Sequence, residues 1–376
     1  MAKTLIFVVN VDWFFVSHRL PIAIEAIRCG YKVHIVTTLT NKFEELERCG
    51  IVVHSLKMKR QGMSILNSIL GMLQLFTIFH SVRPDIVHLV TIKPVLLGGL
   101  MARAAQVPCV VAAVSGLGFV FTARGWRSSI RRKIVSFFYR VALGHRNVKV
   151  IFQNADDLIE LSSSANLRKS NTVLIRGSGV DLTRFCFTPL PKGVPVVMLA
   201  ARLLIDKGVG EFVQSAKLLK NRGCVARFVL VGAIDSANPT SFNESQVSSW
   251  ALEGCVEYWG PISDMNSVLS SATIVVLPSY REGLPKVLIE AAACGRPVIT
   301  TDVPGCRDSI QQGITGVLVP PYDAESLANA VHDLLSDPVR CKAMGESGRK
   351  FAESVFDVRT VINKHMEIYE ELVMKI

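Results

Sequence analysis

One short segment contains two carboxylates that could take part in catalysis or in ligand binding. The segment reads S-Y-R-E-G-L-P-K-V-L-I-E-A-A-A-C-G from Ser279 and follows an apolar run that predicts a strand. Glu282 and Glu290 are eight positions apart, and Glu290 stands among leucine, isoleucine and alanine. A carboxylate in apolar surroundings needs a polar partner, and a pair of ligand hydroxyls such as a ribose diol would serve. The structural alternatives are a helix-face Glu290 paired with an arginine and a Glu282 that merely begins a helix.

The helix predicted within this segment offers a site for an anion. Pro285 suits the first helical position, where its missing N–H costs no hydrogen bond, and Gly295 suits the end. The backbone N–H groups of Gly283 and Leu284 would then lie at the helix N-terminus, where they and the helix dipole favour a phosphate. We therefore expect a phosphorylated ligand beside the two carboxylates.

Two cations follow another predicted strand, in the sequence A-A-R-L-L-I-D-K-G from Ala200. Arg202 and Lys207 would stand at the end of that strand, where two positive charges neutralise a departing diphosphate. The sequence contains no D-x-D motif that would hold a metal there, and its nine cysteines never form a C-x-x-C pair. We therefore expect no metal site and no cofactor. Two surface cations in a loop are the alternative, which the nearby carboxylates make less attractive.

The elements that must position these residues alternate between strand and helix along the chain. Apolar runs rich in valine and isoleucine recur between amphipathic stretches of helix length, as parallel sheets covered on both faces require. The predicted strands are 4–9, 32–37, 52–55, 86–90, 109–114, 149–152 and 172–175, then 194–199, 226–231, 256–258, 273–277, 298–301 and 316–319. The fold class is therefore α/β, with doubly wound parallel sheets that bind ligands at the carboxyl ends of their strands.

A proline-rich stretch divides this alternation into two domains. Three prolines and a glycine between Pro189 and Pro195 sustain neither a helix nor a central strand, so they predict a linker between residues 1–188 and 189–357. Two such sheets facing each other would form an interdomain cleft. Neither domain has G-x-G-x-x-G after its first strand or G-x-x-x-x-G-K-[ST] anywhere, which removes the main support for dinucleotide oxidoreductases and P-loop enzymes.

The charge of the chain is concentrated in its first half. The whole chain carries +11, and residues 1–190 contain 24 Lys and Arg against 10 Asp and Glu. The first half therefore faces something anionic. Residues 57–80 and 124–149 combine basic, aromatic and aliphatic residues without an acid, a pattern typical of segments that lie on an anionic membrane surface. Ordinary surface helices are the alternative, a spanning helix over 61–79 is less favoured because of its polar residues, and no nucleic-acid motif accompanies the charge.

Several motifs along the chain resemble those of a known family. The pattern A-R-x-x-x-x-K-G at 201–208, a strand ending in Val231-Gly232, and E-G-x-P-x-x-x-x-E at 282–290 resemble the family-4 retaining glycosyltransferases of the two-Rossmann GT-B type. The sequences D-I-V-H at 85–88 and V-L-I-R-G-S-G-V-D at 173–181 extend the resemblance over essentially the whole chain. The stretches 9–21 and 114–118 are similar to bacterial enzymes that extend polyprenyl-diphosphate-linked oligosaccharides, including α-1,3-N-acetylgalactosaminyltransferases.

The resemblance implies roles for individual residues. Arg202 and Lys207 would bind the donor diphosphate, Glu290 the ribose and Glu282 the donor sugar, with Gly283 and Leu284 offering backbone amides. The full donor set is Arg202, Lys207, Gly232, Glu282, Gly283, Leu284, Pro285 and Glu290, and the catalytic set is Glu282, Arg202, Lys207 and His88. The acceptor set is His18, Arg19, Lys93, Ser115 and Gly116, in which Ser115 stands where many relatives have a histidine.

The resemblance also implies an activity and a location. The enzyme would be a metal-independent, retaining hexosyltransferase that moves a sugar from a UDP-sugar to a polyprenyl-diphosphate-linked acceptor in bacterial surface polysaccharide assembly, such as that of lipopolysaccharide O-antigen. Residues 1–188 would face acceptor and membrane, 189–357 would bind the donor, and a helix at 358–376 would pack back on the first domain. The protein would be cytoplasmic and peripheral on the inner face of the plasma membrane. The alternatives are a UDP-sugar epimerase of the same fold and a non-catalytic scaffold of a polysaccharide assembly complex.

Overall fold

The computed structural model describes residues 2–56, 65–117 and 126–375, and side chains within these ranges except at 65 and 126–130. Two compact units are present, one of residues 1–178 and 359–376 and the other of Gly179–Val358. The division follows Ser178, upstream of the predicted boundary at 188, because Val180 and Phe185 pack into the core of the second unit.

Unit 1 contains a seven-stranded parallel sheet in the order β3-β2-β1-β4-β5-β6-β7. The strands are β1 (Thr4–Val11), β2 (Lys32–Thr38), β3 (Val52–Ser55), β4 (Ile86–Val90), β5 (Cys109–Val114), β6 (Val148–Phe152) and β7 (Thr172–Leu174). The register aligns Leu5 of β1 with Val33 of β2 on one side and with Ile86 of β4 on the other. The central strands are almost wholly buried, which explains their continuous apolar sequences.

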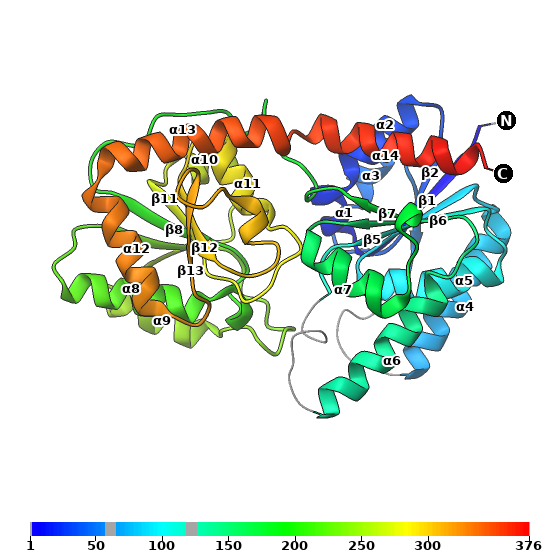
Figure 1. Ribbon diagram of the computed structural model, residues 1–376, viewed down its shortest axis with the longest axis horizontal. Helices are drawn as coiled ribbons and strands as arrows, with labels where there is room; N and C mark the ends of the chain where they lie inside the picture. The colour runs from blue at the N-terminus through cyan, green and yellow to red at the C-terminus, as the bar shows by residue number, and fades with distance from the viewer. Residues whose placement is uncertain (1, 57–64, 118–125, 376) are drawn as a thin grey trace. The chain divides into compact units, whose positions relative to one another are not determined.

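Helices cover both faces of this sheet (Figure 1). One face packs against α4 (Ile65–Val82), α5 (Gly99–Ala104), α6 (Trp126–Ala142) and α7 (Ala155–Ala165), with a π-helical turn, η1 (Pro94–Gly98), before α5. The other packs against α1 (Asp12–His18), α2 (Leu20–Arg28), α3 (Phe43–Arg48) and the C-terminal helix α14 (Val358–Val373), and a short 3-10 turn, η3 (Lys169–Asn171), precedes β7. Val361, Ile368 and Tyr369 of α14 are buried in this second core, so the end of the chain completes the unit in which the chain began.

Unit 2 contains a six-stranded parallel sheet in the order β10-β9-β8-β11-β12-β13. The strands are β8 (Val196–Ala200), β9 (Arg227–Val231), β10 (Glu257–Gly260), β11 (Ile274–Leu277), β12 (Val298–Thr301) and β13 (Gly316–Val319). Its helices are α8 (Val209–Asn221), α9 (Glu244–Leu252), α10 (Met265–Ser270), α11 (Lys286–Ala293), α12 (Ala324–Ser336) and α13 (Pro338–Val355), with 3-10 turns η4 (Ile205–Lys207) and η5 (Arg307–Ser309). All predicted strands of both halves are present within two residues at either end.

A buried arginine ties the proline-rich stretch to unit 2. Arg296 is fully buried between α11 and β12, and its guanidinium donates to the carbonyl oxygens of Thr188 at 2.7 Å, Pro189 at 3.1 Å and Ala272 at 3.3 Å. Carbonyl acceptors compensate for the lost hydration of this cation. The stretch predicted as a free linker therefore begins as a fixed part of unit 2.

Candidate functional site

The donor-site residues predicted from the sequence gather at the carboxyl edge of the unit 2 sheet. Arg202 follows β8, Gly232 follows β9, and Glu282 lies between β11 and α11. Gly232 has a φ of 144°, and a Cβ atom there would lie 1.8 Å from the carbonyl oxygen of Ala201. Only glycine permits this approach of the β9 end to the loop that carries Arg202.

Lys207 and Glu282 form a direct ion pair between two loops of this edge. The Lys207 ammonium contacts Glu282 Oε1, and the Ser279 hydroxyl donates to the same oxygen at 2.8 Å. The exposed fractions of the two charged side chains are 19% and 13%, so the pair is partly shielded from water. A cation and an acid from different loops thus meet at one point of this edge.

Arg202 has a carboxylate partner that the sequence reasoning missed. Its Nη1 donates to Asp235 Oδ2 at 2.9 Å, and Asp235 is held in the loop after β9 by the Ser241 hydroxyl, which accepts from its backbone N–H at 3.0 Å. Because one guanidinium has five N–H donors, Arg202 keeps further donors for a ligand while Asp235 fixes its direction. The position of Asp235 just beyond the end of β9 is the sequence signal that would have found it.

Glu290 is buried inside unit 2 and pairs with a residue of its own helix. It is 7% exposed, and Lys286 Nζ lies 3.3 Å from its Oε1 at helical i,i+4 spacing. Burial raises the pKa of Glu290, and the charges of Lys286 and Arg184 oppose that rise. The helix-face alternative is thus realised with a lysine in place of an arginine, and Lys286 is the second residue that the sequence reasoning missed.

The helix α11 begins at Lys286, one residue later than predicted. Pro285 is its N-cap, with φ −70° and ψ 117°, so the proline precedes the first helical residue. Gly283 and Leu284 lie directly before it, and the loop after β12 packs closely against them. A Cβ atom on Gly305 would lie 2.5 Å from the carbonyl oxygens of both Glu282 and Gly283. This contact holds the turn that brings Glu282 to Lys207.

In unit 1, the carboxyl edge carries several of the predicted acceptor residues. Lys93 follows β4, and Ser115 and Gly116 follow β5. Lys93 is half-buried, which lowers the pKa of its ammonium. The Ser115 hydroxyl is buried and has no hydrogen-bond partner within the described ranges. Gly116 has a φ of 110°, and the structure describes the chain only as far as residue 117 at this point.

A strained residue lies at the same edge and was not predicted. Thr91, directly after β4, has a φ of 74°, which is a rare conformation for a β-branched residue. Its hydroxyl accepts from Asn10 Nδ2 at 2.8 Å, while Asn10 Oδ1 is buried without a partner among the described side chains. Backbone strain of this kind clusters at ligand sites. Asn10 and Thr91 therefore join Lys93 and Ser115 as candidate contacts for a ligand of unit 1.

The expectation that His88 is catalytic and Arg19 binds the acceptor is wrong. His88 has no exposed area and Arg19 is 2% exposed, so neither side chain can touch a substrate. His88 Nδ1 lies 2.6 Å from the Tyr369 hydroxyl of α14, and its ring stacks on that of His365 at a centroid distance of 5.6 Å. Burial lowers the pKa of His88 and His365, the latter to about 3. These residues form a polar contact beneath the C-terminal helix.

His18, the remaining predicted acceptor residue, is half-buried at the end of α1. Its ring stacks on Phe14 with the centroids 4.0 Å apart, and its Nδ1 lies 3.2 Å from the Phe14 carbonyl oxygen. Asp12, at the start of the same helix, accepts hydrogen bonds from the backbone N–H groups of Thr40 at 2.7 Å and Lys42 at 3.1 Å. The helix that carries His18 is thus tied to the loop after β2.

The two segments predicted to lie on a membrane are described in part. Residues 57–64 and 118–125, which include Lys57, Lys59, Arg60 and Arg124, lie outside the described residues. On α4, an exposed apolar stripe at helical spacing consists of Leu66, Ile69, Leu70 and Leu73. On α6, Ile134, Phe137 and Phe138 are exposed among the side chains that the structure describes. Among the helices that the structure describes, none is both long and apolar enough to cross a membrane.

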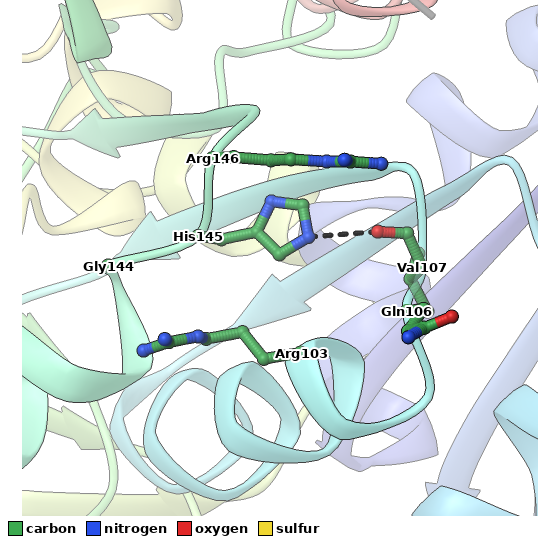
Figure 2. A pocket seen from close by; sticks show the side chains of 6 residues that line it. All are labelled: Arg103, Gln106, Val107, Gly144, His145 and Arg146. Carbon is green, nitrogen blue, oxygen red and sulfur yellow. Dashed lines mark hydrogen bonds between the residues drawn. The ribbon is translucent and has the colours of Figure 1, made fainter.

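A hollow of about 460 Å³ lies at the opposite edge of the unit 1 sheet (Figure 2). It precedes β5 and β6, and Figure 2 shows the His145 ring between Arg103 and Arg146, directed at the Val107 carbonyl oxygen at a distance of 2.8 Å. Arg103 Nη1 donates to the Val141 carbonyl oxygen at 2.6 Å, near the end of α6. Cations at helix C-termini are stabilised by the last carbonyls, which accounts for Arg103 without a ligand. Across residues 2–56, 65–117 and 126–375, no three or more His, Cys, Asp or Glu side chains are grouped to hold a metal ion.

Comparisons with known proteins agree with this architecture. Residues 4–154 match the family described as glycosyl transferase 4-like, and residues 194–337 match that described as glycosyl transferases group 1. The chain is 25% identical to the N,N'-diacetylbacillosaminyl-diphospho-undecaprenol alpha-1,3-N-acetylgalactosaminyltransferase of Campylobacter jejuni, over 95% of this chain and 96% of that one.

Solved structures resemble the whole chain. The sucrose-phosphate synthase of Thermosynechococcus elongatus superposes with a TM-score of 0.80 at 21% identity, covering 100% of both chains. The Anabaena protein HepE, solved in complex with UDP, superposes with a TM-score of 0.76 at 19% identity, covering 98% of this chain and 100% of that one. Together with the two parallel sheets, these matches show that the chain belongs to the family-4 glycosyltransferases of the GT-B fold.

Proposed function

We propose that this glycosyltransferase moves a hexose or N-acetylhexosamine from a UDP-sugar to a polyprenyl-diphosphate-linked sugar, with retention of the anomeric configuration. The observation that carries the proposal is the Lys207–Glu282 ion pair at the carboxyl edge of unit 2, an edge that also carries Arg202 after β8. Glu290 is buried in the helix α11 that follows Glu282. Two cations suit a diphosphate, and a buried carboxylate suits the hydroxyls of a ribose. The bacterial relative named for a diphospho-undecaprenol acceptor supports the acceptor class.

In this mechanism the protein acts by positioning and by stabilising charge. The bond between the anomeric carbon and the diphosphate oxygen breaks, and the acceptor oxygen bonds to that carbon on the same face while its proton passes to the departing diphosphate. Arg202 and Lys207 stabilise the negative charge that develops on the leaving group, so the reaction needs no metal ion for that task. Glu282, held by Ser279 and Lys207, accepts hydrogen bonds from donor sugar hydroxyls.

On unit 1, Lys93, Ser115, Asn10 and Thr91 are proposed to contact the acceptor. Lys93 is a cation suited to the acceptor diphosphate, and Asn10, Thr91 and Ser115 are partly exposed polar residues of the same edge. His18 remains a proposed contact on the neighbouring helix. Because Ser115 cannot replace the chemistry of a histidine, it is assigned to binding.

We also propose that unit 1 rests on an anionic membrane surface through α4 and α6, at the inner face of the plasma membrane. The exposed stripe of α4 carries no charge, and α6 carries five cations and no acid. Exposed apolar side chains would enter the interface while the cations of α6 contact anionic headgroups. This location brings the enzyme to a lipid-linked acceptor and assigns it to the assembly of a bacterial surface glycan.

The test is UDP release by the purified protein, offered UDP-GalNAc, UDP-GlcNAc, UDP-Gal and UDP-Glc in turn with a bacterial polyprenyl-diphosphate-sugar extract. We expect one donor to give lipid-dependent release, and Lys207→Ala to lower it by about two to three orders of magnitude. Lys217→Ala is the matched control, because Lys217 forms an exposed ion pair with Glu253 away from these loops. An isomerised UDP-sugar formed without lipid would indicate an epimerase. Absence of UDP binding would indicate the scaffold alternative and overturn the proposal.

A further inference from the structure

An exposed tyrosine in unit 2 stands in a conformation that tyrosine rarely adopts. Tyr322, in the loop between β13 and α12, has a φ of 63° and is 66% exposed. Glycine and asparagine occupy this left-handed region at little cost, whereas a bulky side chain is strained there. Because the residue is largely exposed, burial in the hydrophobic core does not explain why tyrosine occupies the position. Strain of this kind points to a ligand.

The ring of Tyr322 lies against a second tyrosine that is firmly anchored. The centroids of the Tyr322 and Tyr280 rings are 3.9 Å apart, with their planes inclined by 37°. The Tyr280 hydroxyl donates to Glu211 Oε1 at 2.7 Å, and its backbone N–H donates to the Asp206 carbonyl oxygen at 3.0 Å. Burial and the Glu211 carboxylate raise the pKa of Tyr280, so the phenol remains a donor. Tyr280 therefore supports one face of Tyr322 and leaves the other face open.

The pair lies at the edge of the sheet that also carries the donor-site residues. Tyr280 follows β11 and Tyr322 follows β13, and these parallel strands flank β12, so both loops emerge at the carboxyl edge. Tyr280 is two residues before Glu282, and Asp206 is next to Lys207. The helices α8 and α12, which begin beside the two tyrosines, pack together on one face of the sheet (Figure 1).

We propose that Tyr322, supported by Tyr280, is a stacking site for a pyranose unit of a glycan. A pyranose with equatorial hydroxyls presents axial C–H groups on one face, and these polarised hydrogens are attracted to the negative face of an aromatic ring. Because Glu211 Oε1 accepts from the Tyr280 hydroxyl, the ring on which Tyr322 lies is fixed in place before a sugar binds. The site goes beyond the proposed transfer reaction, in which neither Tyr280 nor Tyr322 is assigned a part.

Saturation-transfer NMR with N,N'-diacetylchitobiose as the probe tests this site. We expect transfer to the axial ring protons with the wild-type chain and at least a several-fold loss with Tyr322→Asn, whereas sorbitol, an open-chain polyol without such a face, receives none. Because asparagine tolerates positive φ, Tyr322→Asn should unfold at the same temperature as wild type or higher. Phe43→Asn, which removes a 41% exposed aromatic ring from unit 1, is the matched control and should leave the signal unchanged.

Titration with UDP in the same samples separates this inference from the proposed function. If the wild-type chain binds UDP but gives no chitobiose signal, or if Tyr322→Asn retains the signal, the stacking site is refuted and the transferase proposal stands. An equal response to sorbitol also refutes it. If chitobiose binds through Tyr322 but UDP does not bind at all, the stacking site stands and the proposed function fails.

Discussion

Replacing two exposed leucines of α4 by serine should weaken binding of the protein to anionic membranes without unfolding it. Leu66 and Leu73 are 66% and 58% exposed and lie two helical turns apart on the same stripe. Because they make few contacts within unit 1, the double variant Leu66→Ser/Leu73→Ser should change the free energy of unfolding by less than about 0.5 kcal/mol. Any loss of binding would then report on the membrane contact itself.

The expected size of the effect follows from the exposed fractions. Complete burial of a leucine side chain contributes roughly 1.5–3 kcal/mol, and the two exposed fractions together amount to slightly more than one leucine. Insertion of this surface into the interface would contribute about 2 kcal/mol, which corresponds to roughly a 30-fold change in the partition constant. The cations of α6 add an electrostatic contribution that added salt should weaken.

The assay is co-sedimentation with vesicles of phosphatidylglycerol and phosphatidylethanolamine, with phosphatidylcholine vesicles for comparison. Leu252→Ser is the matched control, because Leu252 is 88% exposed on α9 of unit 2 and lies outside the proposed contact. If the double variant binds as tightly as wild type, or if Leu252→Ser weakens binding equally, the assignment of α4 to the membrane surface is wrong.

Three further predictions concern buried ionisable residues. Burial raises the pKa of Glu290 and Lys286 opposes the rise, so donor binding should weaken as pH falls toward that raised pKa. Lys286→Met should move the acid limb of the plot of KM against pH to higher pH. If the limb does not move, Lys286 does not influence the titration of Glu290. Arg296→Met leaves several carbonyls of unit 2 without their donor and should lower the free energy of unfolding, measured in urea, by about 2–4 kcal/mol. A loss below about 1 kcal/mol would contradict this prediction. Burial lowers the folded-state pKa of His88 and His365, so the unfolded chain binds more protons than the folded chain below about pH 6.5. The free energy of unfolding should therefore decrease as the pH is lowered, by up to about 1.4 kcal/mol per histidine per pH unit. Equal urea midpoints at pH 7 and pH 5 would contradict this last prediction.

The strands and the donor motif were predictable because their signals are local. The buried strands are short apolar runs bounded by turn residues, and each was predicted to within two residues at its ends. Glu282 and Glu290 lie in one contiguous segment, and Arg202 and Lys207 in another. The carboxyl ends of parallel strands share one edge, so both segments were expected at that edge, and the pairing of β8 with β11 in the structure makes them neighbours.

Residues whose surroundings come from distant parts of the chain were not predicted correctly. His88 and Arg19 look like free polar residues in the sequence, but α14, which is 281 positions away at the His88–Tyr369 contact, covers them. The boundary near 188 was misplaced for a similar reason, since the prolines mark where regular structure stops and not where packing changes. No sequence pattern indicated Tyr322, because what distinguishes it is a positive φ angle and a contact with Tyr280 from another loop.

The fold class, the strands and the residues that lie at the carboxyl edge of unit 2 could all be read from the amino-acid sequence. Which side chains are accessible followed from the packing of the elements, which buries His88, pairs Arg202 with Asp235, and leaves Leu66, Leu73 and Tyr322 exposed. The physical reason is that local conformation follows from backbone preferences and hydrophobic periodicity, which neighbouring residues encode. Exposure and pairing depend on atoms brought together by the packing of whole elements, and no spacing within a segment records them.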